Sequence, residues 1–489
     1  MTILAPLSPL FFTSSYAFYA VINFIFLAIV IFAERKNPTS ALAWIMVSML
    51  LPGVGFIFYF FFGRNLSRRK IFNMPDNEQK ALQAFYQGQA EAIKMGEWTI
   101  AEENAKSYAD KILLHLNNSN SLYFEQNEVE LFTDGTAKFQ ALFADLKAAK
   151  NHIHLDYYIL NNDELGNQLL AILEQKAKEG VQVRLLFDDL GGRTLRKGKF
   201  KVLVENGGQY ARFFSSSFRL INPRINYRNH RKIAVIDGKI GYIGGFNIGD
   251  EYLGKNKRFG YWRDSALRIQ GESVYELQTR FMLDWRAASN EDLLPDGSTF
   301  PYLSSHNTCG MQIVSSGPDE EWEQVKSGYI KMIQSAKEYV YIHTPYFIPD
   351  EAVLEALRIA SFSGVDVRLM IPNKPDHPFV YWATTAWASE LLKAGGRVYI
   401  YENGFLHSKT MVVDGRIASC GTANFDYRSF KLNFEVVAFV YNCEIADQMR
   451  EAFMSDLADC TEITEAEYEK RPWNMRFKEQ ISRLLSPLL

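Results

Sequence analysis

The feature that most constrains this chain is a short pattern, H-x-K-x(4)-D, that occurs twice at one fixed offset. The first copy lies in NHRKIAVIDGKIGYIGGFN and the second in LHSKTMVVDGRIASCGTANFD. The matched positions are His230 and His407, Lys232 and Lys409, Asp237 and Asp414, and Asn247 and Asn424. Each pair is separated by 177 residues (407 − 230, 409 − 232, 414 − 237, 424 − 247). Four equal offsets do not arise by chance, so the chain contains a tandem repeat and should fold as two related halves.

In each copy the pattern predicts a β-hairpin that carries its His and Lys on one face. The motif runs into a stretch rich in Ile and Val, and Asp237-Gly238 is a strong signal for a two-residue hairpin turn. Side chains two positions apart on a strand point to the same face, so His230 and Lys232 can face one pocket together. Asp237 and its repeat Asp414 belong to the turn at the far end, which indicates that they tie the hairpin structurally even though they complete the motif.

The residue types of the motif suit chemistry on a phosphate. An imidazole supplies a nucleophile and a neighbouring ammonium stabilises the charge that develops. A nucleophilic imidazole also needs its second nitrogen held by an acceptor. Asp264 and Glu435, each downstream of a hairpin, are the candidates for that role, with ordinary surface strand positions as the alternative. The acids lack the clustered spacing of a two-metal phosphatase, and His152 with His154 has no adjacent ligand set, so we expect no metal.

Helices alternate with buried strands in the same order in both halves. Strands are expected at 129–133, 152–160 and 181–187 with helices at 136–150 and 166–179, and the order returns between 321 and 371. This predicts an α/β fold with a mixed sheet in each half. The expected organisation is a membrane hairpin at 1–70, a helical linker at 71–118, one lobe at 119–290, a connector at 291–310 and a second lobe with the tail at 311–489.

The first seventy residues differ sharply from the rest. The run 11–32 is uncharged and long enough to cross a bilayer, whereas the equally long run 41–62 contains Pro52 and Gly53. We expect a two-helix transmembrane hairpin, with a re-entrant second segment as the alternative. The larger basic cluster follows the second run, which predicts a cytoplasmic location for everything downstream. A net charge of −3 argues against a nucleic-acid partner, and the four cysteines form no C-x-x-C pair.

With these motifs the sequence resembles the phospholipase D superfamily, and within it the bacterial cardiolipin synthases. The resemblance is carried by NYRNHRKIAVIDGKIGYIGGFNIGDEY, GYWRDSALRIQGESVYELQTRFMLDW, HTPYFIPD and HSKTMVVDGRIASCGTANFDYRSFKLNFE, and it covers nearly the whole chain. Thr422 stands where many relatives have Ser. The resemblance implies two tandem phospholipase D-type α/β/α lobes with mixed sheets that share one active site, preceded by the N-terminal transmembrane helical hairpin.

The resemblance also implies a mechanism. One His attacks the lipid phosphorus to give a phosphatidyl-histidine, while the other protonates the departing alcohol and deprotonates the incoming one. By analogy His230 is the nucleophile and His407 the acid, although the sequence leaves the reverse assignment open. Such a division requires that the pKa values of the two imidazoles be pushed apart by their surroundings. The groups expected to hold the phosphoryl oxygens are Lys232, Lys409, Asn247 and Asn424.

The reaction implied is a reversible phosphatidyl transfer between two phosphatidylglycerol molecules that gives cardiolipin and glycerol, without a cofactor. The expected partners are these membrane lipids, and the expected location is the bacterial cell (inner) membrane, with several spans and the catalytic lobes on the cytoplasmic side. Oligomeric state is left open, with a homo-oligomer among the options. The alternatives are a membrane phospholipase D that passes the intermediate to water, another phosphatidyltransferase, and an inactive membrane scaffold, which would have no need of two complete motifs.

Overall fold

The computed structural model describes residues 38–51, 54–59, 71–72, 76–98, 100–215, 226–303 and 307–486, with a few single positions between 21 and 31. The chain divides into two compact units. One consists of Met1–Lys70 with Ser216–Tyr227, and the other of Ile71–Ser215 with Arg228–Leu489. Both copies of the motif belong to the second unit, which therefore holds every residue of the predicted site.

In the first unit, helix α2 (Pro38–Leu50) precedes the short helix α3 (Val54–Phe58). The end of α2 at Leu50 fits the sequence, because a residue directly before a proline, here Leu51 before Pro52, is disfavoured in a helix. None of the helices in the described part of the chain combines the length and apolar character needed to cross a membrane. Most of the predicted span 11–32 lies outside the described residues, and the described part of 41–62 forms two separate helices instead of one.

Three helices precede the first lobe: α4 (Asp76–Met95), α5 (Glu103–Lys106) and α6 (Ala109–Ser119). Ile112 and Leu116 of α6 are buried in the same apolar core as Tyr329 and Val437 of the second lobe. In α6 the apolar residues recur four positions apart and form one face. The last helix of the segment expected as a helical linker therefore packs against the second lobe.

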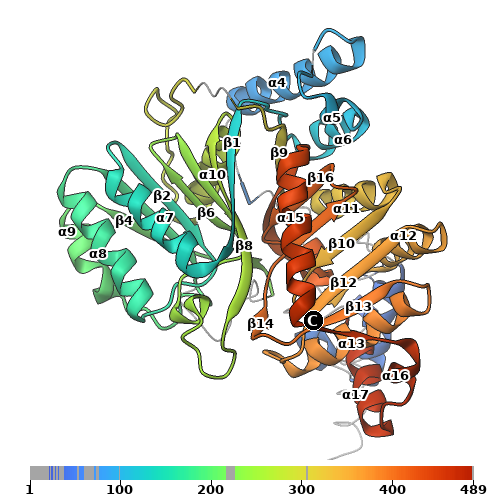
Figure 1. Cartoon of the computed structure of the whole chain (residues 1–489). Helices are drawn as coiled ribbons and strands as arrows, with labels where there is room; N and C mark the ends of the chain where they lie inside the picture. Colours follow the sequence, from blue (N-terminus) through green and yellow to red (C-terminus); the bar gives the residue numbers. More distant parts are fainter. Residues whose placement is uncertain are drawn as a thin grey trace, which may run out of the picture. The chain divides into compact units, whose positions relative to one another are not determined.

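The first lobe is a mixed sheet with helices on it (Figure 1). Its strands run in the order β1-β8-β7-β6-β2-β3-β4, with β2, β3 and β4 parallel and the other pairs antiparallel. The bounds are β1 Asn127–Asp134, α7 Gly135–Ala148, β2 His152–Tyr157, α8 Glu164–Lys178, β3 Gln182–Asp188, η3 Lys197–Phe200, α9 Lys201–Glu205, β4 Gln209–Phe213, β5 Arg228–Asn229, β6 Lys232–Ile236, β7 Ile240–Gly244, η4 Asp250–Leu253, β8 Trp262–Gly271 and α10 Val274–Ser289.

The second lobe repeats this plan, with strands in the order β19-β13-β12-β10-β15-β16-β18 and β9 beside β18. This confirms the predicted α/β fold with a mixed sheet in each half. The bounds are β9 Met311–Ser316, α11 Gln324–Ser335, β10 Tyr339–His343, β11 Phe347–Ile348, α12 Glu351–Phe362, β12 Asp366–Pro372, α13 Pro378–Leu392, β13 Arg397–Tyr401, β14 Phe405–Leu406, β15 Thr410–Val413, β16 Ile417–Gly421, β17 Phe425–Asp426, α14 Tyr427–Lys431, β18 Asn433–Val440, α15 Cys443–Asp456, η5 Leu457–Asp459, β19 Cys460–Ile463, α16 Glu465–Glu469 and α17 Trp473–Leu484.

The two lobes exchange short strands. β5 of the first lobe pairs in parallel with β18 of the second, and β14 of the second lobe pairs in parallel with β8 of the first. Each of these two-residue strands directly precedes the motif histidine of its own lobe. An apolar core that includes Ile233 and Leu267 from one sheet and Val412 and Val436 from the other joins the lobes. The exchange therefore anchors each histidine to the opposite sheet.

Candidate active site

The first site histidine is held by a carboxylate of the opposite lobe. Nδ1 of His230 lies 2.9 Å from Oε2 and 3.0 Å from Oε1 of Glu435 on β18. The β5–β18 pairing fixes this contact, because the backbone N–H of His230 donates to the carbonyl of Phe434 at 2.9 Å. His230 therefore directly follows the residues of β5 that pair in parallel with β18, and this pairing places its ring next to the Glu435 carboxylate.

The second site histidine repeats the arrangement in reverse. Nδ1 of His407 lies 2.6 Å from Oδ2 of Asp264 on β8, and the His407 N–H donates to the carbonyl of Arg263 at 2.7 Å. Asp264 and Glu435 thus occupy the position expected of acceptors for the imidazoles. Each acid serves the histidine of the other lobe, a crossing that the motif spacing did not show.

Both rings are largely buried, and their Nδ1 atoms are occupied. Tyr158 meets the His230 ring edge-on at 4.9 Å, and Trp262 lies 5.3 Å from the His407 ring, centroid to centroid. Neither Nε2 atom has a hydrogen-bond partner among the residues that the structure describes. An imidazole whose Nδ1–H donates to a carboxylate keeps its lone pair on Nε2, which is the nucleophilic or proton-accepting position. Neither aromatic neighbour could be predicted, because no spacing in the sequence relates these residues to the motif histidines.

Both imidazoles are neutral in the resting site. Burial lowers the pKa of His230 to about 4, against the opposing effect of Glu435. Burial, reinforced by the neighbouring ammonium of Lys409, likewise lowers the pKa of His407 to about 4. Desolvation and a nearby ammonium act in the same way on both rings, so the pKa values of both are lowered in the site without substrate.

The lysines connect the two halves of the site. Nζ of Lys232 donates to the carbonyl of His230, and Nζ of Lys409 donates to the carbonyl of His407. Burial lowers the pKa of Lys232 to about 7 and that of Lys409 to about 8, although the buried carboxylates oppose this. Lys409 also lowers the pKa of His230, and Lys232 lowers the pKa of His407. The lysine of each motif therefore acts electrostatically on the histidine of the other.

The two carboxylates remain ionised despite complete burial. Burial alone would raise the pKa of Asp264, but Lys409 and His407 bring it below the ordinary value. The same balance holds for Glu435, whose pKa is lowered by His230 and Lys232 against burial. A buried carboxylate that stays charged can hold an imidazole in one tautomer and stabilise its cation.

The surroundings of the two carboxylates differ. Glu435 accepts hydrogen bonds from the Thr422 hydroxyl at 2.6 Å and from the Asn433 amide at 3.2 Å, besides His230. Asp264 accepts one from the backbone N–H of Ser265 at 2.8 Å, besides His407. Gly245 occupies the position of Thr422 in the first lobe, where a Cβ would lie 2.0 Å from Oδ1 of Asp264. The second glycine of the first motif copy is thus required by the closeness of Asp264.

The two predicted phosphate-binding asparagines are already engaged with the protein. Asn247 accepts from the N–H of Ile159 at 3.0 Å and donates to the Tyr252 hydroxyl at 2.8 Å. Asn424 donates to Asp426 at 3.0 Å. Each amide nitrogen thereby uses one of its two N–H groups and retains the other.

Asp237 and Asp414 lie in the hairpin turns and not in the site. Each has a left-handed backbone, with φ of +55° and +52°. The carboxylate of Asp237 accepts the N–H groups of residues 150–152 at 2.7 to 3.0 Å, and that of Asp414 accepts those of residues 337–339 at 2.8 to 2.9 Å. Each carboxylate ties its hairpin to the start of the neighbouring strand, the structural role that the turn position indicates.

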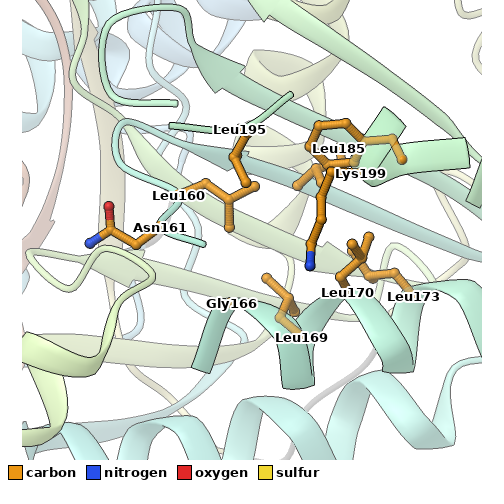
Figure 2. A pocket seen from close by; sticks show the side chains of 10 residues that line it. Leu160, Asn161, Gly166, Leu169, Leu170, Leu173, Leu185, Leu195 and Lys199 are labelled. Carbon is orange, nitrogen blue, oxygen red and sulfur yellow. The ribbon is translucent and has the colours of Figure 1, made fainter. Parts of the chain in front are cut away.

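The rings of His152 and His154 both lie within hydrogen-bond distance of the Gln278 amide. Across the described ranges, no three His, Cys, Asp or Glu side chains gather as a metal site would require. The cavity in Figure 2 lies in the first lobe and is lined mostly by leucines of β3 and α8 and the segments beside them. Its volume of about 10 Å³ has room for no more than a water molecule, so it is a packing gap.

A family described as "Cardiolipin synthase, PLD-like domain" matches residues 142–285 and 329–457, and one described as "Phospholipase_D-nuclease N-terminal" matches residues 21–64. The cardiolipin synthase of Listeria innocua is 51% identical over 470 residues, covering 96% of this chain and 98% of that protein. The major cardiolipin synthase ClsA of Bacillus subtilis is 51% identical over 472 residues, with the same coverage. A phosphatidylserine synthase structure from Haemophilus influenzae shares the fold, with a TM-score of 0.58 at 12% identity over 77% of this chain and 99% of that one.

Proposed function

The chain belongs to the cardiolipin synthase family of phospholipase D-like proteins, and we propose that it transfers a phosphatidyl group from one phosphatidylglycerol to another, giving cardiolipin and glycerol. The observation that carries this proposal is the pair of crossed dyads, His230 with Glu435 and His407 with Asp264, in one buried environment. Two neutral imidazoles and two lysines around one centre suit double displacement at a phosphodiester, which needs a nucleophile, an acid that becomes a base, and charge stabilisation.

In the first step, Nε2 of one imidazole attacks the phosphorus of phosphatidylglycerol. The bond from nitrogen to phosphorus forms as the bond from phosphorus to the glycerol oxygen breaks, and the second imidazolium gives its proton to that oxygen. The products are a phosphatidyl-histidine and free glycerol. In the second step, the now neutral second imidazole takes a proton from the glycerol hydroxyl of another phosphatidylglycerol. That oxygen attacks the phosphorus, and the first imidazole departs with its lone pair.

We assign His230 as the nucleophile and His407 as the acid and base. The shorter contact, 2.6 Å, is the one between His407 and Asp264, and Asp264 has fewer competing donors than Glu435. A carboxylate whose charge is less shared with other donors stabilises an imidazolium more strongly. His407 is therefore the better proton carrier, whereas Glu435 chiefly orients His230.

Proton uptake accompanies substrate binding in this scheme. Both imidazoles have a pKa of about 4 without substrate, so neither carries the proton that the departing glycerol needs. The negative phosphodiester favours the protonated form of a ring beside it, which raises the pKa of His407 when lipid binds. Lys232 and Lys409 face the same charge and hold the phosphoryl oxygens as negative charge builds, with the remaining N–H groups of Asn247 and Asn424.

We also propose that the enzyme works at the bacterial cell membrane, with the catalytic unit on the cytoplasmic side. The support is the match of residues 21–64 to a family N-terminal segment, the two long uncharged runs, and the basic cluster after the second run. Donor and acceptor are both lipids of one bilayer, so an anchor near the N-terminus confines the site to the plane in which they diffuse.

The test uses purified full-length protein in micelles of phosphatidylglycerol, with lipid products analysed by mass spectrometry. Cardiolipin with an equal amount of free glycerol supports the synthase. Phosphatidic acid as the main product would instead show a hydrolase, and no turnover would show a scaffold. His230→Ala and His407→Ala are each expected to abolish cardiolipin formation.

A further inference from the structure

The last helix of the chain is placed with its apolar side outward. The residues of α17 (Trp473–Leu484) that are exposed and apolar are Trp473 (77% exposed), Phe477 (53%), Ile481 (40%) and Leu484 (77%). Their spacing of four, four and three residues puts them in one stripe. The buried residues Glu479 and Ser482 are polar and lie on the other side of the helix. A helix that only covered a core would have the opposite orientation, so the stripe is available to an external partner.

The orientation of α17 is fixed by specific contacts. Glu479 accepts a hydrogen bond from the Tyr468 hydroxyl at 2.8 Å and pairs with Arg471. Just beyond the helix, the Ser486 hydroxyl accepts from the Trp387 indole at 2.9 Å. Figure 1 shows α17 beside α13 in the second lobe. Because its inward side is tied by polar contacts, α17 cannot roll to bury the stripe without breaking them.

The charge on α17 indicates the kind of partner. Arg476 and Lys478 are exposed between the stripe residues, and Arg483 is about one-third exposed where it pairs with Glu390. The acid of the helix, Glu479, is buried and paired. The glutamates of the neighbouring α16 are exposed and carry negative charge, so the positively charged surface is limited to α17. An apolar stripe with basic residues beside it is the arrangement of helices that lie in the interface of an anionic bilayer.

A cation–π contact and an aromatic pair connect α17 with the beginning of α13. Lys478 lies over the ring of Trp382 on α13 at 5.0 Å, and Trp382 meets Phe379, which is 50% exposed, edge-on at 5.7 Å. Asp376, two residues before α13, accepts a hydrogen bond from Tyr346 and acts electrostatically on Lys409 of the site. Phe379, in the first turn of α13, thus lies three residues from a carboxylate that acts on the site.

We propose that the stripe of α17, together with Phe379, docks on the surface of an anionic lipid bilayer and holds the active site against it. This second contact goes beyond the proposed function and does not depend on the reaction. It would position the site at the depth of lipid headgroups, and it would favour membranes rich in the anionic lipid that the enzyme consumes.

Hydrogen–deuterium exchange of the full-length protein in lipid nanodiscs tests the docking directly. Amides of 473–484 should exchange about tenfold more slowly in discs containing phosphatidylglycerol than in discs of phosphatidylcholine alone. The double variant Trp473→Ser, Phe477→Ser should lose this protection. Trp322→Ser, which removes an equally large side chain that is 63% exposed elsewhere in the second lobe, should retain it. Equal exchange in both kinds of disc would overturn the proposal, as would protection that appears in detergent and grows with protein concentration, since the partner would then be a second copy.

Turnover separates this proposal from the proposed function. The double variant should make cardiolipin at the parent rate from micelles of short-chain phosphatidylglycerol and about tenfold more slowly from bilayers. Equal rates in bilayers would overturn the docking role while leaving the synthase intact. If neither protein makes cardiolipin in any lipid, the proposed reaction fails, and the exchange experiment still decides whether α17 binds the membrane.

Discussion

Nδ1 of His230 lies 2.9 Å from Oε2 of Glu435, a residue 205 positions later in the chain and in the opposite lobe. The reciprocal contact joins His407 to Asp264. Neither lobe therefore contains a complete histidine–carboxylate pair of its own. The duplication is needed for chemistry as well as for symmetry, because each half supplies the acceptor that the other half requires.

Glu435→Gln should lower the turnover number by a factor on the order of 10³, because a neutral amide no longer fixes the tautomer of His230 or stabilises its cation. Glu435 raises the pKa of His230, so its loss should lower that pKa below its present value of about 4. Nuclear magnetic resonance of labelled histidine should show this change at His230 and none at His407. A change confined to His407 would show that the pairing is not crossed.

Asp237→Ala should destabilise the protein by about 2 kcal/mol, since three backbone N–H groups lose their acceptor and a left-handed turn residue is replaced by one that disfavours it. The folded fraction should keep a turnover number within a few-fold of the parent value. Denaturant unfolding and initial rates measured on the same samples check both expectations. Unchanged stability with abolished turnover would instead show that Asp237 takes part in the reaction.

Gly245→Ala should reduce turnover by about a hundredfold or more, because its Cβ would lie 2.0 Å from Oδ1 of Asp264 and displace the acceptor of His407. Gly198→Ala, where a Cβ meets nothing within 4 Å, is the matched control and should be indistinguishable from the parent. Initial rates of cardiolipin formation give the comparison. A fully active Gly245→Ala would mean that the geometry around Asp264 is not required.

Affinity for a phosphodiester should fall as pH rises. The pKa of Lys232 is about 7 and that of Lys409 about 8, so their ammonium groups lose protons between pH 6 and 9, and the bound anion loses its counter-charges. Protonation of His407 on binding acts in the same direction. Calorimetric titration with glycerophosphoglycerol, whose charge is constant over this range, should show weakening of about tenfold or more from pH 6 to pH 9. Affinity that is constant or that rises with pH would contradict the proposed anion site.

Much of this architecture could be predicted from local pattern. The motif strand Lys232–Ile236, the turn at Asp237 and the alternating helices and strands follow from Ile and Val content, Asp-Gly turn chemistry and helical spacing. The structural role of Asp237 and Asp414 followed from the turn itself. These features depend on residues close together in the chain, where geometry is set by a few neighbouring side chains.

Local sequence patterns could not predict the crossed histidine–carboxylate pairs or the pKa values of the site residues. β5 and β14 are two residues long and have no periodicity that a sequence pattern could reveal. The lowering of both histidine pKa values also could not be predicted, because it results from burial, a tertiary property. The outward stripe of α17 also depends on tertiary contacts, since the position of Glu479 decides which side of the helix faces the protein.

Two imidazoles that act on one phosphorus in divided roles can be distinguished by trapping the intermediate. A phosphatidyl ester of p-nitrophenol needs no acid to release its alcohol. In the His407→Ala variant, His230 should therefore still attack this ester, but the variant should not transfer the phosphatidyl group efficiently to an acceptor. We expect a burst of one nitrophenolate per chain, followed by a stalled protein with a single phosphatidyl group on the peptide containing His230. Two equivalents per chain, or no adduct at His230, would contradict this division of roles.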